Sequence, residues 1–187
     1  MNFKNLLPEV RVSSKRVIIA RILILLLMTA NLSFIWYNSS KTAKDSTDIS
    51  KSVTESVAPH VIDKFDELSK DEQDKEIVKL NPIIRGLAHS LEYIPLGVLL
   101  FLLVLSVFKV DYGIRKENLI SISVLSLVVA LLFALVDEIH QIFVDGRTFE
   151  LKDIALDMLG MFSGYAFSSL IFAIYKIKNK KTSFPLK

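Results

Sequence analysis

The chain has 187 residues, of which 51% are hydrophobic and 23% charged, and it contains no cysteine. Its mean hydropathy of +0.43 is higher than that of an ordinary soluble domain, and the apolar residues are gathered in a few long blocks. This composition excludes a disordered chain and a disulfide framework, and a net charge of only +3 gives no support for a nucleic-acid partner.

Four apolar blocks are each long enough to cross a bilayer as a helix, which takes about 20 residues. They run from about Val17 to Tyr37, Gly86 to Phe108, Leu119 to Val136 and Ile154 to Tyr175. Because lipid offers the backbone no hydrogen-bond partners, all four are expected to be α-helices. The first block follows a basic segment, as a signal peptide would, but it is too long and lacks a small-residue cleavage site. We therefore interpret it as an uncleaved span.

The distribution of Lys and Arg predicts which way the spans point. Basic residues gather in a leader (residues 1–16), between the second and third spans, and in a tail (residues 176–187). The first loop (residues 38–84) has ten acidic residues against seven lysines, and the segment from Asp137 to Asp153 has five acidic residues against two basic ones. We therefore expect both termini in the cytoplasm, and the first loop and the last connection outside.

The loop after the first span (residues 17–37) is expected to combine a linker with short helices. Residues 38–54 are rich in Ser, Thr and Lys, which indicates a flexible, solvated linker. Apolar residues then recur at helical spacing from Val57 to Leu68 and predict an amphipathic helix, on the outer leaflet or over the bundle. Ser69 is expected to cap a second short helix that ends at Leu80, before Pro82 interrupts the chain.

Ionisable residues inside membrane spans are costly, and they usually face the protein interior or a water-filled cavity. Three polar clusters break the apolar pattern at the ends of the helices that we expect to face outward. They consist of Arg85, His89, Glu92 and Tyr93; of Asp137, Glu138, His140 and Gln141; and of Arg147, Asp153 and Asp157. In the second cluster, His140 and Gln141 are expected to share a face with Asp137, and Glu138 to point aside. Further along, Gly160-x-x-x-Gly164 predicts a close approach by another helix, within the bundle or between copies.

These clusters leave several interpretations open. The first is a structural network that ties the spans together. The second is a metal site, for which His89 with Glu92 and Glu138 with His140 would supply ligands, although no third histidine is near. The third is acid–base catalysis on a lipid-linked substrate, with His89, Glu92, Asp137, Glu138 and His140 as candidate catalytic residues. The fourth is a binding site in which Arg85 and Arg147 hold a phosphate or carboxylate. We favour binding, without a metal or cofactor.

The order of these motifs resembles the VanZ-like family. The resemblance rests on His89-x-x-Glu92-Tyr93, on Asp137-Glu138-x-His140-Gln141, on Gly146-Arg147 and on Asp153 leading to Gly160, and it covers about Arg85 to Gly164. Family members often carry Asn where this chain has Asp157, so this chain adds a carboxylate. The family is named for a membrane protein associated with resistance to teicoplanin. The resemblance implies a small multi-pass protein of the bacterial cell membrane, with a VanZ-like core of three helices over residues 85–175.

Together these observations predict an all-α integral membrane bundle of four transmembrane helices, with an extracytoplasmic loop and short-helix segment after the first. The second, third and fourth spans are expected to enclose an outward-facing polar pocket, and the first span to be peripheral. The pocket would engage an anionic lipid or cell-wall precursor and lower sensitivity to teicoplanin-type glycopeptides. Membrane lipids, a lipid-linked wall precursor or a lipoglycopeptide are the candidate partners. An enzyme and a structural protein are the alternatives, and the sequence leaves the oligomeric state open.

Overall fold

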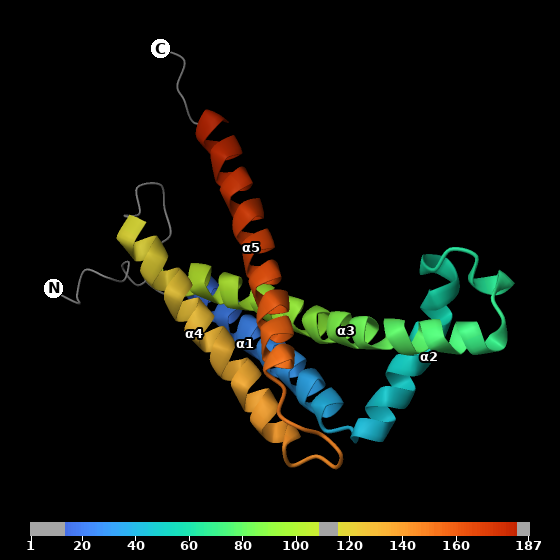
Figure 1. Cartoon of the computed structure of the whole chain (residues 1–187). Helices are drawn as coiled ribbons and strands as arrows, with labels where there is room; N and C mark the ends of the chain where they lie inside the picture. Colours follow the sequence, from blue (N-terminus) through green and yellow to red (C-terminus); the bar gives the residue numbers. More distant parts are fainter. Residues whose placement is uncertain (1–13, 109–115, 183–187) are drawn as a thin grey trace.

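The computed structural model describes residues 14–108 and 116–182. In these residues the chain forms α1 (Lys15–Ser39), α2 (Ala43–Val61), α3 (Lys70–Val107), α4 (Lys116–Gln141) and α5 (Leu151–Thr182), with a short 3₁₀ helix, η2 (Phe65–Glu67), between α2 and α3. Figure 1 shows α1, α3, α4 and α5 packed into a bundle, while α2 and the start of α3 project from its side.

Four of these helices are long and apolar enough to cross a membrane: α1, α3, residues Ser123–Gln141 of α4 and residues Leu151–Lys178 of α5. Only 11% of the most apolar part of α1 is buried, so most of its apolar surface needs lipid as its neighbour. The prediction of an all-α bundle with four spans is therefore confirmed, and the chain is a multi-pass membrane protein.

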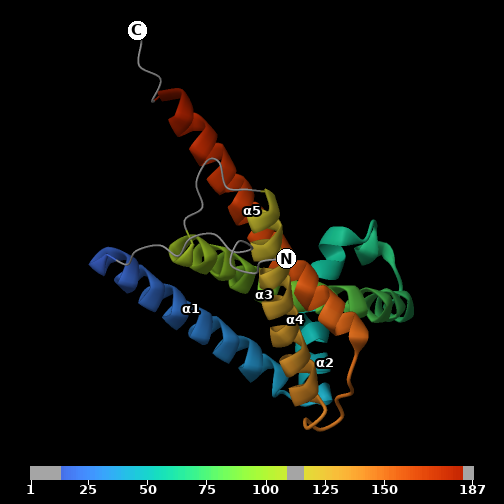
Figure 2. The same ribbon diagram turned by 90° about the vertical axis from the view of Figure 1, so that its left-hand side faces the viewer.

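Consecutive spans run in opposite directions (Figures 1 and 2). Near the start of α1, Arg21 Nη2 donates to the carbonyl of Ser106 in the last turn of α3, at 2.6 Å. Further along α1, Asn31 Nδ2 donates to the carbonyl of Glu92 in the middle of α3, at 3.3 Å. The antiparallel order gathers the ends of α1 and α4 and the start of α5 at one end of the bundle, here called the site end.

Glycines allow the backbones of α3 and α5 to touch. A Cβ atom on Gly160 of α5 would overlap the carbonyl of Ser90 in α3. A Cβ atom on Gly97 of α3 would overlap the carbonyl of Met161 in α5, and Gly164 makes the same kind of approach one turn later. The small-residue stripe predicted on α5 therefore packs within the bundle.

The prediction of a flexible linker over residues 38–54 is wrong, because α2 begins at Ala43. Thr42 caps this helix by accepting a hydrogen bond from the Asp45 backbone N–H at 3.1 Å. Hydroxyl groups within α2 donate to carbonyls one turn earlier, as Thr47 does to Ala43 at 2.7 Å, so the helix satisfies its own polar side chains. The buried Thr54 packs toward α3, where its hydroxyl lies 3.1 Å from Asn81 Oδ1.

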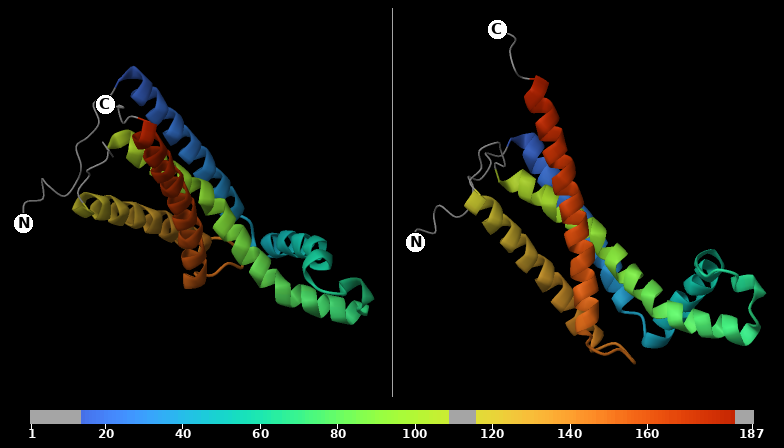
Figure 3. Two further views of the ribbon diagram at one scale, coloured as in Figure 1. Left: turned by 90° about the horizontal axis from the view of Figure 1, so that it is seen from above. Right: turned by 45° about the horizontal axis from the view of Figure 1, so that its top comes forward.

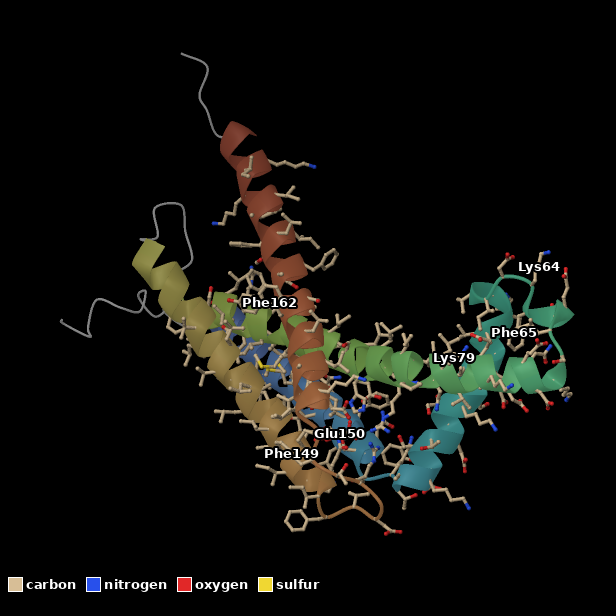
Figure 4. The ribbon with its side chains drawn as sticks, in the orientation of Figure 1. Lys64, Phe65, Lys79, Phe149, Glu150 and Phe162 are labelled. Atoms are coloured by element: carbon tan, nitrogen blue, oxygen red, sulfur yellow. The ribbon has the colours of Figure 1, made fainter. Side chains whose placement is uncertain are left out.

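The structure also differs from the predicted helices over Val57 to Leu68 and over Ser69 to Leu80. α2 ends at Val61, and Lys64 has a φ of 55°, in the left-handed region, where the chain turns back toward α3. Ala58, Phe65 and Ile77 then form a small core between α2 and α3 (Figure 4 labels Phe65), so this apolar face is covered by α3.

Ser69 begins a helix as predicted, but the helix does not stop at Leu80. α3 continues for 38 residues and includes both Pro82 and Pro95. A proline inside a helix removes one backbone hydrogen bond, and packing of α3 against its neighbours offsets that loss. At this length α3 measures roughly 57 Å, nearly twice the hydrocarbon core of about 30 Å. The hairpin of α2 and the start of α3 therefore extends beyond the bundle, as Figure 3 shows.

Candidate functional site

Polar side chains from four helices converge at the site end. In Figure 4, Glu150 marks the start of α5 beside a dense group of side-chain nitrogen and oxygen atoms. Four carboxyl groups in this group are buried, namely Asp137 and Glu138 of α4 and Asp153 and Asp157 of α5. Because buried carboxyl groups are rarely tolerated without partners, the contacts of each one define the site.

Asp137 is held by α1 and by its own helix. The Ser39 hydroxyl donates to Asp137 Oδ1 at 2.6 Å, and Gln141 Nε2 donates to Asp137 Oδ2 at 3.2 Å. Both oxygens of this carboxyl group are therefore occupied by protein donors, which fits an orienting role. The side chain of Tyr93 in α3 is almost fully buried.

The first span is peripheral in its packing, as expected, because little of its apolar part is buried, but its end contributes side chains to the site, which the sequence did not predict. Besides Ser39, α1 supplies Asn38, whose Nδ2 donates to Glu92 Oε1 at 2.9 Å. These α1 residues were missing from the predicted site. A signal for them exists in the sequence, because Asn31 and Asn38 are seven residues apart, two helical turns, inside an otherwise apolar block. Both contact Glu92 of α3.

His140 lies against α1. Its ring stacks on Trp36, with centroids 4.0 Å apart and an interplanar angle of 20°, and its Nε2 lies 3.0 Å from the Ser40 hydroxyl. Glu138 is fully buried on the inner face of α4, which corrects the prediction that it points aside. Its Oε2 accepts a hydrogen bond of 2.8 Å from the Glu150 backbone N–H, so Glu138 caps the start of α5. Glu138 and His140 therefore have different partners, and they do not form the ligand pair that the alternative of a metal site would need.

The His89 imidazole links α3 to two carboxyl groups of α5. Its Nδ1 lies 3.5 Å from Asp157 Oδ1, and its Nε2 lies 3.8 Å from Asp153 Oδ2. Asp153 Oδ2 also lies 3.4 Å from Arg85 Nη2. Within the described residues, neither oxygen of Asp157 has a hydrogen bond of good geometry, and Glu138 Oε1 has none either. Buried oxygen atoms without hydrogen bonds lower the stability of a protein, and they are typical of functional sites, where stability is not the only requirement.

Arg147 extends from the connection between α4 and α5 toward the end of α1. Gly146, with a φ of 70°, forms the turn that precedes it. Arg147 Nε donates to the Lys41 carbonyl at 3.3 Å and Nη1 donates to Gln141 Oε1 at 3.2 Å. Burial lowers the pKa of the Arg147 guanidinium, and the nearby charge of Arg85 lowers it further. An arginine nevertheless stays protonated at neutral pH, so Arg147 brings a fixed positive charge.

Two pockets open beside these residues. The first has a volume of about 140 Å³ and lies between the end of α1, α2 and α3, with Arg147 completing its lining. Its cations are Lys41, Arg85 and Arg147, next to His89, and its one carboxyl group is Glu92. The second pocket, also about 140 Å³, lies between α2, α3 and the start of α5. Both pockets depend on α2, which the sequence did not indicate as part of the site.

The predicted residues differ in where the structure places them. Arg85, His89, Glu92 and Arg147 line the first pocket; Arg85 and Asp153 line the second; and Tyr93, Asp137, Glu138, Gln141 and Asp157 are buried nearby. His140 lines neither of these two pockets. The arrangement thus places positively charged groups at the pocket surface with a layer of buried carboxyl groups close to them.

Metal chemistry has little geometric basis in the described residues, because no group of three His, Asp or Glu side chains is placed to hold a metal ion. Anion binding fits the geometry better, since guanidinium groups hold phosphate or carboxylate oxygens through paired N–H donors. Proton transfer through His89 is a further chemical capacity of the arrangement.

Comparison with protein-family models finds a match over most of the chain. The VanZ/LLP1 family model matches residues 22–173, which include α1 from its second turn onward, all of α2 and every site residue described above. No curated protein and no solved structure matches the chain.

Proposed function

This chain belongs to the VanZ/LLP1 family, and from that premise we propose that it binds the anionic headgroup of a lipid or lipid-linked wall precursor. Binding takes place at the outer face of a bacterial cell membrane and lowers sensitivity to teicoplanin-type glycopeptides. The family resemblance supports the link to these drugs, and the distribution of Lys and Arg supports the outward direction of the site end.

The observation that carries the proposal is the pairing of Arg85 and Arg147 in one pocket. Each guanidinium is anchored on one side, Arg85 by Asp153 and Arg147 by Gln141, and each keeps further N–H donors for a ligand. Anchored arginines lose less rotamer freedom on binding than free ones do. The pocket is therefore prepared for a phosphate or carboxylate before any ligand arrives.

The remaining lining of the first pocket suits the junction between a headgroup and a lipid chain. Ile49 and Val53 of α2 and Ile84 of α3 form an apolar wall beside the charged groups. A small inorganic anion would gain nothing from this wall, whereas an amphipathic molecule would bury part of its chain there. Lipid headgroups and lipid-linked wall precursors both meet this requirement.

Acid–base chemistry is a second candidate, favoured by the position of His89 between Asp153 and Asp157. A histidine in contact with two carboxyl groups can hold and pass a proton. This candidate requires Asp157 to be ionisable, whereas binding through the arginines does not.

The proposal is tested by expressing the chain in a susceptible Gram-positive host and measuring the minimal inhibitory concentration of teicoplanin together with membrane abundance. The wild-type chain should raise that concentration. Arg147→Ala should abolish the increase without lowering abundance, and Arg147→Lys should restore part of it, because it keeps the charge but not the paired donors.

Lys44→Ala is the matched control, since Lys44 is an exposed cation of α2 that lines neither polar pocket. It should protect as well as the wild-type chain does. Full protection by Arg147→Ala at normal abundance would contradict the proposal.

A further inference from the structure

The second pocket adjoins the first but has a different chemical character. Ser50 and Arg85 line both pockets. The rest of the polar lining of the second pocket comes from Thr47 of α2, Asn81 of α3, and Glu150, Lys152 and Asp153 at the start of α5. Its cations, Arg85 and Lys152, are matched by two carboxyl groups, so this pocket does not favour a second anion.

Several hydrogen-bonding groups in this pocket have capacity left for a ligand. Asn81 Oδ1 lies 3.1 Å from the Thr54 hydroxyl, which leaves the amide Nδ2 as a donor. Asp153 faces Arg85 through Oδ2, which leaves Oδ1 as an acceptor. The pocket thus offers both hydrogen-bond donors and acceptors, some neutral and some charged. This mixture suits a molecule with many hydroxyl groups, because a hydroxyl group both donates and accepts.

The volume of the second pocket suits one ring. At about 140 Å³ it is close to an engineered protein cavity of roughly 150 Å³ that holds a benzene molecule. Unlike that cavity, this one is lined mostly by polar side chains, so a ring that carries hydroxyl groups fits and an apolar ring does not.

We infer that the second pocket binds the sugar ring of a sugar phosphate whose phosphate group lies in the first pocket, held by Arg85 and Arg147. This inference rests on the proposed function and makes it specific. The ligand class is then a lipid anchor joined through phosphate to a single sugar next to it. A soluble sugar phosphate has the same headgroup chemistry but would not use the apolar wall of the first pocket.

The test uses the full chain in phosphatidylcholine nanodiscs and native mass spectrometry to measure binding of polyprenyl phosphate with and without one attached glucose. The wild-type chain should bind the glucose-bearing lipid about tenfold more tightly, as expected for one or two added hydrogen bonds to charged groups. Glucose 1-phosphate as a competitor distinguishes the two sources. If glucose 1-phosphate competes only weakly with the glucose-bearing lipid, the site is assigned to lipid-linked sugars. If it competes as strongly as the lipid itself does, the site is assigned to soluble sugar phosphates.

Thr47→Phe provides the steric variant, because Thr47 lines the second pocket and not the first. It should remove the preference for glucose and leave binding of polyprenyl phosphate unchanged. Asp48→Phe is the matched control, since Asp48 is exposed on the same helix and lines neither pocket, and it should keep the preference.

A wild-type chain that binds the two lipids equally would overturn the sugar subsite alone, as would a preference that persists in Thr47→Phe. A wild-type chain that binds neither lipid, or an Arg147→Ala variant that binds both as tightly as the wild type, would overturn the proposed function as well.

Discussion

The Ser39 hydroxyl in the last turn of α1 donates a buried hydrogen bond of 2.6 Å to Asp137 in the last turn of α4. This contact joins two spans that are almost 100 residues apart in the chain. Because Gln141 donates to the other oxygen of Asp137, the carboxyl group has one fixed orientation. The first span is thus part of the site, in agreement with a family match that begins at residue 22.

Ser39→Ala should therefore destabilise the protein. The substitution removes the donor to Asp137 Oδ1 and leaves a buried carboxyl oxygen without that partner, at a cost of about 1–3 kcal/mol. Thermal unfolding of the detergent-solubilised protein should show a lower Tm. Ser52→Ala is the control, since Ser52 is exposed on α2, and it should leave the Tm nearly unchanged. Equal Tm values for the two variants would show that the contact contributes nothing.

The contact between α3 and α5 should be sensitive to a single methyl group. In Gly160→Ala the new Cβ would overlap the Ser90 carbonyl, so the helices must separate, at a cost of about 1–3 kcal/mol or more. In Gly86→Ala the nearest atom is the flexible Leu156 Cδ1, 3.1 Å from the new Cβ, which can move aside. A chemical denaturation series should rank Gly160→Ala well below Gly86→Ala in stability, and the reverse order would contradict the packing described.

Hydropathy and helical spacing predict the spans and much of the site. The four apolar blocks form four long helices, because in lipid the backbone N–H and C=O groups must form hydrogen bonds within their own segment. The spacing of His89 and Glu92 on one helical face, and of Asp137 and Gln141 on another, was enough to bring these residues to the same end of the bundle.

The contribution of α2 could not be predicted in the same way. Its Ser- and Thr-rich sequence is typical of a linker, and its helix depends on contacts formed only in the folded chain, such as that between Thr54 and Asn81. The effect of Pro82 was also predicted wrongly, because α3 continues through it although a proline usually interrupts a helix. Local sequence patterns predict poorly wherever tertiary packing decides the conformation.

We predict that the site end faces the outside of the cell. Because the chain contains no cysteine, single cysteines can be introduced and labelled to test this prediction. Asp145→Cys places a thiol in the exposed connection between α4 and α5, and Lys178→Cys places one near the opposite end of α5. If the site end faces outward, a membrane-impermeant maleimide should label Asp145→Cys on intact cells and Lys178→Cys only after the cells are opened. Labelling in the opposite pattern would place the site in the cytoplasm.

Replacing Asp153 and replacing Asp157 by Asn should affect different properties of the protein. Asp157 is fully buried, and its oxygens have no hydrogen bond of good geometry, so its charge is costly. The amide of Asp157→Asn carries no charge and can donate to His89, so we expect a stability gain of about 1 kcal/mol and unchanged protection against teicoplanin. Asp153 instead faces Arg85 at 3.4 Å and His89 at 3.8 Å.

Asp153→Asn removes the negative charge that orients Arg85 in both pockets, so protection should fall while the protein still accumulates in the membrane. Drug susceptibility and the Tm, measured side by side for the two variants, separate the candidate functions. Loss of protection in Asp157→Asn at normal abundance would favour acid–base chemistry through His89, because binding through the arginines does not need that carboxyl group. Retained protection in Asp157→Asn together with loss in Asp153→Asn is the pattern expected when the site works by holding an anion.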